Sequence, residues 1–88
     1  MSEQKITENC ISAFREYLVL EEKSRATVEK YLRDVRAFSG FAGGQYVTKE
    51  LVIAYKQSLL EKGYAVRSIN SMLASINSLF VFLGWHDL

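Results

Sequence analysis

The sequence has no proline, one cysteine and one histidine among its 88 residues, and its net charge is only +1. A single cysteine excludes a disulfide within the chain, and one cysteine with one histidine cannot supply the four ligands of a structural zinc site. We therefore expect neither a metal nor a cofactor. Because the charges nearly balance, the chain as a whole has no strong attraction to nucleic acid, and any such attraction has to be local.

A secretory signal and long apolar runs are also missing. The N-terminus is polar, and no apolar run approaches the ~18 residues that a membrane span needs. Hydrophobic residues still make up 49% of the chain, which is enough for the small core of one domain. These features predict a single soluble, cytoplasmic domain over residues 1–88 that makes no membrane contact.

Four segments show helical periodicity. The lack of proline, with glycines standing between these segments, favours an all-α domain. Thr7, Ser24 and Thr48 stand where helix N-caps are needed, and Gly63 and Gly84 stand where helices end. The short loops predict a compact four-helix bundle. The predicted helices cover residues 7–20, 24–41, 48–62 and 66–83.

Apolar residues repeat along one side of each predicted helix. Val81 and Phe82 fall outside the stripe of the fourth helix. With Trp85 and Leu88 they either fold back onto the first helix or contact another domain or subunit. The expected core stripes are Ile11, Phe14 and Leu18; Val28, Tyr31, Leu32, Val35 and Phe38; Leu51, Val52, Tyr55 and Leu59; and Val66, Ile69, Met72, Leu73, Ile76, Leu79, Phe80 and Leu83.

No sequence pattern for catalysis is present. His86 is expected to be a solvated side chain, and Cys10, beside the first apolar stripe, to be a small half-buried one. Gly43 and Gly44 belong to no phosphate-binding loop pattern. We expect no catalysis from this chain alone.

The fourth predicted helix has an unusual polar side. It carries small or amide residues where a solvated helix normally carries lysine and glutamate. Such a side allows another surface to approach closely. That surface is either a DNA groove, where serine and asparagine can bind phosphates or base edges, or a partner helix. The spacing alone does not decide between the two. The residues on this side are Arg67, Asn70, Ser71, Ala74, Asn77 and Ser78.

The second predicted helix supplies local positive charge along one polar side, interrupted by Glu29 and Asp34. Taken alone, this side fits an ordinary solvated face with pairs such as Lys30 and Asp34. The DNA-binding interpretation becomes stronger when this side is considered together with the polar side of the fourth helix, because two polar sides could line one concave surface. The basic and polar residues are Lys23, Thr27, Lys30 and Arg33, with Arg25 and Arg36 nearby.

Nearly the whole chain resembles the N-terminal SAM-like, core-binding domain of tyrosine recombinases, the phage-integrase and Xer-type group. The order and spacing of four stretches carry the resemblance. They are F-R-E-Y-L (residues 14–18), K-S-R-A-T-V-E-K-Y-L-R-D-V-R-A-F (23–38), V-T-K-E-L (47–51) and S-I-N-S-M-L-A-S-I-N-S-L-F-V-F-L-G-W (68–85).

The resemblance implies a four-helix domain that holds one face of double-stranded DNA at the recombination site, while a separate C-terminal domain does the catalysis. The helices matching residues 24–38 and 68–83 approach the major groove and its phosphates in such proteins. The resemblance thus assigns DNA contacts to Lys23, Ser24, Arg25, Thr27, Lys30, Arg33, Arg67, Ser68, Asn70, Ser71, Asn77 and Ser78.

The family's catalytic residues, a nucleophilic tyrosine with arginines, a lysine and histidines, belong to the C-terminal domain and have no match in this chain. We therefore expect a fragment of a longer integrase that is itself monomeric and meets other recombinase subunits only in the full-length protein. The alternative, from the polar side of the fourth helix, is a helical protein–protein interaction module.

Overall fold

The computed structural model describes residues 4–85 and residue 88, and over these residues it contains helices and no strands. The helices are α1 (Glu8–Leu20), α2 (Arg25–Ala42), α3 (Lys49–Glu61) and α4 (Val66–Leu83). The predicted all-α fold of four helices is confirmed, and the predicted boundaries agree closely with the observed ones. The expectation for His86 lies outside the described residues.

Side chains at the predicted N-caps begin three of the helices. The hydroxyl oxygens of Thr7, Ser24 and Thr48 each accept a hydrogen bond of 3.1 Å from a backbone N–H in the first turn. These bonds satisfy donors that the helix itself leaves free. α2 ends at Gly43 and α4 at Gly84, both in the left-handed region with φ of +57° and +78°, where a side chain would be strained.

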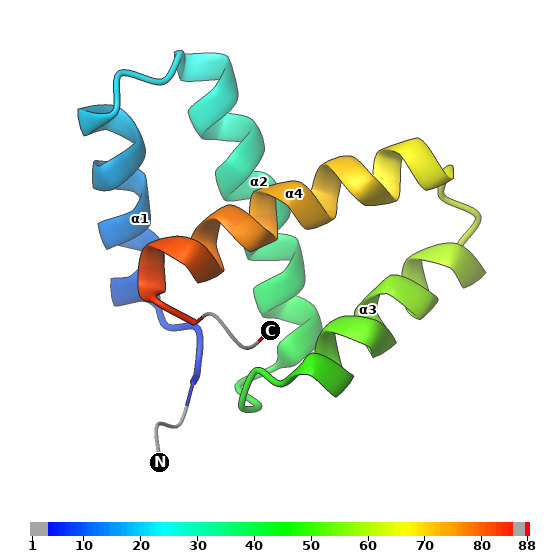
Figure 1. Ribbon diagram of the computed structural model, residues 1–88. Coiled ribbons are helices and arrows are strands. Elements are labelled where there is room, and N and C mark those ends of the chain that lie inside the picture. The colour runs from blue at the N-terminus through cyan, green and yellow to red at the C-terminus, as the bar shows by residue number, and fades with distance from the viewer. Residues whose placement is uncertain (1–3, 86–87) are drawn as a thin grey trace.

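The helices form two hairpins that cross. α1 and α2 lie side by side and antiparallel, and α3 and α4 form the second hairpin (Figure 1). α4 crosses α2, and its C-terminal part reaches α1. The α2–α4 crossing is therefore the contact that joins the two halves of the chain.

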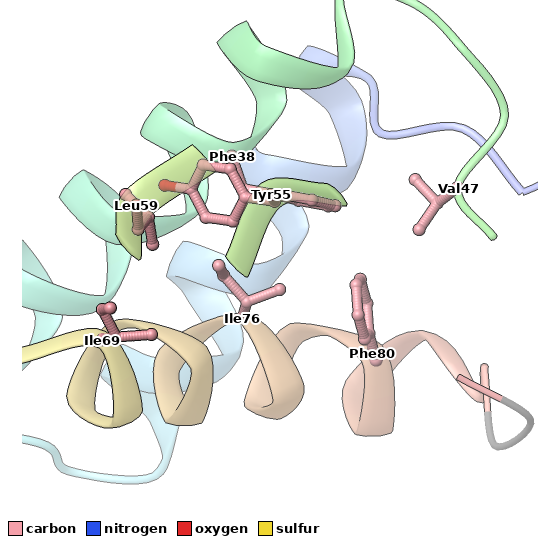
Figure 2. Close-up of a cluster of buried hydrophobic side chains, with 7 residues drawn as sticks. All are labelled: Phe38, Val47, Tyr55, Leu59, Ile69, Ile76 and Phe80. Atoms are coloured by element: carbon pink, nitrogen blue, oxygen red, sulfur yellow. The ribbon is translucent and has the colours of Figure 1, made fainter. Parts of the chain in front are cut away.

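The core consists of two clusters, one on each side of this crossing. The first is formed by α2, α3 and α4, and its rings are close, with Phe38 lying 5.1 Å from Tyr55 and 6.0 Å from Phe80 between ring centroids (Figure 2). The second is formed by α1, α2 and α4 around Phe14. Each large apolar side chain buried here contributes roughly 1.5–3 kcal/mol. The buried members are Phe38, Val47, Tyr55, Leu59, Ile69, Ile76 and Phe80 in the first cluster, and Ile11, Phe14, Leu18, Val28, Val35 and Leu79 in the second.

One residue of α4 differs from the sequence prediction, and the position of Phe82 agrees with one of the two alternatives left open for it. Val66, expected in the core, is 64% exposed because it occupies the first position of the helix, beyond the α2–α4 contact. Phe82, outside the predicted stripe, folds back onto α1, with its ring 4.8 Å from Tyr17 and 5.7 Å from Phe14. Trp85 packs instead on Phe80, 5.7 Å away.

α4 also has the length and mean hydropathy, 1.3, that a membrane-spanning helix needs. The expectation concerned uninterrupted apolar runs, and α4 is not one, because Arg67, Asn70 and Asn77 lie within it. Its most apolar side chains, including Ile69, Ile76 and Leu79, are buried against the other three helices. The high hydropathy is accounted for by the role of α4 as the central core helix.

Candidate functional site

An open hollow of about 550 Å³ lies between α2, the N-terminal half of α4 and the turn that precedes α4. Each helix contributes a polar flank to it because the apolar stripes of both helices face the core. The lining residues are Lys30, Arg33, Asp34, Ala37, Tyr64, Arg67, Ser68, Ser71 and Met72.

The hollow concentrates positive charge. Three cationic side chains and one carboxylate line it, whereas the whole chain has a net charge of only +1. Arg33 of α2 and Arg67 of α4 are exposed, and neither forms an ion pair with a residue in the described part of the chain. Two guanidinium groups at one concave surface form a fitting site for a phosphate-bearing ligand.

Lys30 is less exposed than the two arginines that line the hollow. Its Nζ atom donates to Asp34 Oδ2 at 2.7 Å, to Ser75 Oγ at 3.2 Å and to the backbone oxygen of Ser71 at 3.3 Å. The first bond lies within α2 and the other two reach α4. Lys30 thus ties the two helices together at their crossing, and 36% of its side chain remains exposed to solvent.

Asp34 and Ser75 form the buried part of this polar contact. Ser75 donates its hydroxyl hydrogen to Asp34 Oδ2 at 2.7 Å, so that oxygen accepts from both Ser75 and Lys30. Burial raises the pKa of the Tyr55 phenol, and the nearby negative charge of Asp34 raises that pKa further.

Five of the residues assigned to DNA contact by the resemblance are brought together in the hollow. They come from α2 and from α4, so the expected meeting of two polar sides at one concave surface is observed. The five are Lys30, Arg33, Arg67, Ser68 and Ser71.

Two other assigned residues lie apart from this hollow. Lys23 and Arg25 line a second hollow between α1 and the start of α2, together with Arg15. Arg25 forms an exposed ion pair with Glu29 at 3.1 Å. Arg36 is turned toward α1, where it pairs with Glu8 at 3.2 Å.

The remaining assigned residues serve local structure or lie on the open side of α4. Ser24 caps α2 and donates to Thr27 Oγ1 at 2.9 Å. Ser78 donates to the backbone oxygen of Ala74 at 3.1 Å, within its own helix. Asn70 and Asn77 are exposed on α4.

Sequence reasoning missed the contributions of Asp34, Ser75 and Tyr64. Asp34 was expected to interrupt a basic side and to pair with Lys30, and that pair is observed at 2.7 Å, but its contact with α4 was not expected and Ser75 had no assigned role. A signal was present, since Ser75 follows Ser71 by one turn and Asp34 follows Lys30 by one turn. Such spacing puts each pair on one side of its helix, but only the helix crossing shows that the two sides meet.

Comparison with known proteins identifies relatives of this chain. The profile of the family described as phage integrase, N-terminal SAM-like domain, matches residues 11–87. The chain is similar to tyrosine recombinase XerA of Pyrococcus horikoshii, with 29% identity over 82 residues, and to tyrosine recombinase XerA of Pyrococcus furiosus, with 29% identity over 87 residues. These alignments cover 93% and 99% of this chain but only 28% and 30% of the relatives. No solved structure gives a significant match.

Proposed function

Because the chain belongs to the family of phage integrase N-terminal SAM-like domains, we propose that it binds double-stranded DNA at the core site of a site-specific recombinase. Its task is to position the duplex for a separate catalytic domain. One observation carries the proposal, namely that α2 and α4 place three cationic side chains around one hollow in a chain that is otherwise nearly neutral. A local basic surface of this kind suits a polyanion.

Phosphate contacts and base contacts fall to different residues in this proposal. Arg33 and Arg67 at the rim of the hollow, with Ser68 and Ser71 beside them, bind backbone phosphates and fix the register of the duplex. Asn70 and Asn77 lie exposed on α4 and carry amides that can pair with an adenine edge.

The contact extends beyond the hollow along both helices. Lys23, Ser24, Arg25 and Thr27 continue it at the start of α2, and Ser78 continues it on α4. Hydroxyl groups that already cap or pair within their own helix add less to the binding than the free amides do.

The proposal assigns no chemistry to the chain itself. Strand cleavage and rejoining belong to the catalytic domain of the parent recombinase, which acts with other recombinase subunits. The chain alone is a cytoplasmic monomer. Its affinity for non-specific DNA should lie on the order of 10⁻⁴–10⁻⁶ M at physiological salt, because one small module makes few contacts.

A titration of the labelled chain with duplex DNA at two salt concentrations tests the proposal. We expect NMR shift changes in α2 and along the polar side of α4, and affinity that falls as salt rises. Shifts confined to α1 and α3, or affinity that does not depend on salt, would contradict it.

One observation favours a second candidate function, a protein–protein interaction module. The outer side of α4 beside Asn70 and Asn77 also exposes Ala74 and Val81, the latter to 59%, and small or apolar residues permit close helix packing. This function predicts self-association or capture of a partner without DNA, at a strength that salt does not change. Sedimentation with and without duplex separates the two functions.

A further inference from the structure

The cationic groups of the hollow are not equally available to a ligand. Arg33 and Arg67 form no ion pair within residues 4–85 and Leu88, whereas Lys30 donates to a carboxylate at 2.7 Å. The Asp34 carboxylate is also held on its buried side, because Asp34 Oδ2 accepts a hydrogen bond from the buried hydroxyl of Ser75. Only 6% of the Asp34 side chain is exposed, against 36% for Lys30.

Because Asp34 is more buried than Lys30, the lysine is the member of the ion pair that can move. The Asp34 carboxylate cannot leave the helix crossing without breaking a buried hydrogen bond. The Lys30 ammonium lies at the edge of solvent on a flexible stem and can turn toward an anion in the hollow. A phosphate that enters the hollow must therefore compete with the Asp34 carboxylate for Lys30. It is also repelled by that carboxylate, because both groups are negatively charged.

We propose that Asp34 lowers the affinity of the hollow for DNA phosphates by competing with them for Lys30. The inference rests on the proposed function, because it takes the duplex as the ligand. It makes Asp34 a determinant of specificity: a weaker phosphate contact in the hollow leaves more of the binding to the exposed groups of α4 that can read bases.

The substitution D34N tests this in the 88-residue chain. The amide keeps an oxygen that can accept from Ser75 but removes the competing charge. We expect D34N to bind duplex at least about threefold more tightly than wild type at low salt. The dependence of log K on log salt should steepen by about 0.9, the value for one added phosphate contact.

The substitution E8Q is the matched control. It changes the net charge of the chain by the same amount and also frees a cation of α2, because Glu8 pairs with the exposed Arg36, but neither residue lines the hollow or is assigned a DNA contact. E8Q should tighten binding less than D34N and leave the salt slope unchanged. Equal tightening by both substitutions, or weaker binding by a D34N protein that circular dichroism shows to be folded, would overturn the inference.

A double-mutant cycle ties the effect to Lys30. Lys30→Met should cost more affinity in the D34N background than in wild type, because Lys30 contacts phosphate fully only once Asp34 is neutral. Equal losses in the two backgrounds would contradict the inference.

An NMR measurement on wild type covers the case in which D34N does not fold. The side-chain ammonium signal of Lys30, assigned by its loss in Lys30→Arg, should shift on addition of duplex, and an unchanged signal would overturn the inference. If the chain and all its variants fail to bind duplex, the proposed function falls together with the inference. If wild type binds and D34N binds no more tightly than E8Q, only the inference falls.

Discussion

The hydroxyl of Ser75 in α4 donates to Asp34 Oδ2 in α2 across 2.7 Å, between two residues that are 1% and 5% exposed. This bond lies at the crossing that joins the two hairpins, and Lys30 completes it from the solvent side. A buried polar contact of this kind is directional, so it defines how α2 and α4 lie relative to one another. The shape of the hollow follows from that relation.

Ser75→Ala should reduce the free energy of unfolding by about 1–2 kcal/mol, because a buried carboxylate oxygen loses one of its two donors. Urea unfolding followed by circular dichroism measures the change. Ser78→Ala is the control on the same helix, since Ser78 donates only to the backbone oxygen of Ala74. A loss from Ser78→Ala as large as that from Ser75→Ala would show that the interhelical bond adds no stability.

Lys30→Met should reduce the free energy of unfolding by about 1–3 kcal/mol, less than for a fully buried pair because part of the lysine is solvated. The reason is that Asp34 keeps its charge but loses its cation. Arg25→Met removes the cation of another i,i+4 pair on α2, one that is 92% and 62% exposed, and should cost at most about 0.5 kcal/mol. The difference between the two variants in urea unfolding checks the prediction.

The fold could be predicted from the sequence because its determinants are local. Thr7, Ser24 and Thr48 act as N-caps through atoms only three residues away, and a stripe such as Ile11, Phe14 and Leu18 is buried in whichever way the helices pack. The prediction for Val66 was wrong for a related reason. Its periodicity is correct, but Val66 stands at the first position of α4, three residues before Ile69, the first buried residue of the helix.

The site could be predicted only in part. Arg33 and Arg67 are polar-side residues of their own helices, so the wheel of each helix places them correctly. The relation of Lys30 to Ser71 and Ser75 spans more than 40 residues of sequence and depends on where the helices cross. The same crossing separates Arg25 from Arg33, although both lie on α2, because the two residues face different hollows.

Arg33→Ala and Arg67→Ala should each weaken duplex binding for all sequences and reduce the salt slope by about 0.9. The physical reason is that each variant lacks one guanidinium group and therefore binds one phosphate fewer. Fluorescence anisotropy at several salt concentrations measures both quantities. Arg36→Ala is the matched control, since Arg36 is an exposed arginine of α2 that pairs with Glu8 away from the hollow. If Arg36→Ala lowers the salt slope as much as the other two, the hollow is not the binding surface.

Tyr55→Phe should change how stability depends on alkaline pH. Burial and the charge of Asp34 raise the pKa of Tyr55 above its ordinary value of about 10 in the folded chain. As pH rises through about 10, the unfolded chain releases this proton while the folded chain keeps it. The contribution of Tyr55 to stability is therefore fully present below that pH and is lost as pH rises toward the folded-state pKa.

Tyr55→Phe has no phenol proton at this position, so it cannot lose stability through the release of that proton. Its free energy of unfolding should therefore fall less steeply above about pH 10 than that of wild type. Urea unfolding at pH 8, 9, 10 and 11 checks the slope. Tyr46→Phe, which removes a phenol that is 47% exposed, is the comparison variant. Identical slopes for wild type and Tyr55→Phe would mean that neither burial nor the charge of Asp34 raises the pKa of Tyr55 in the folded chain.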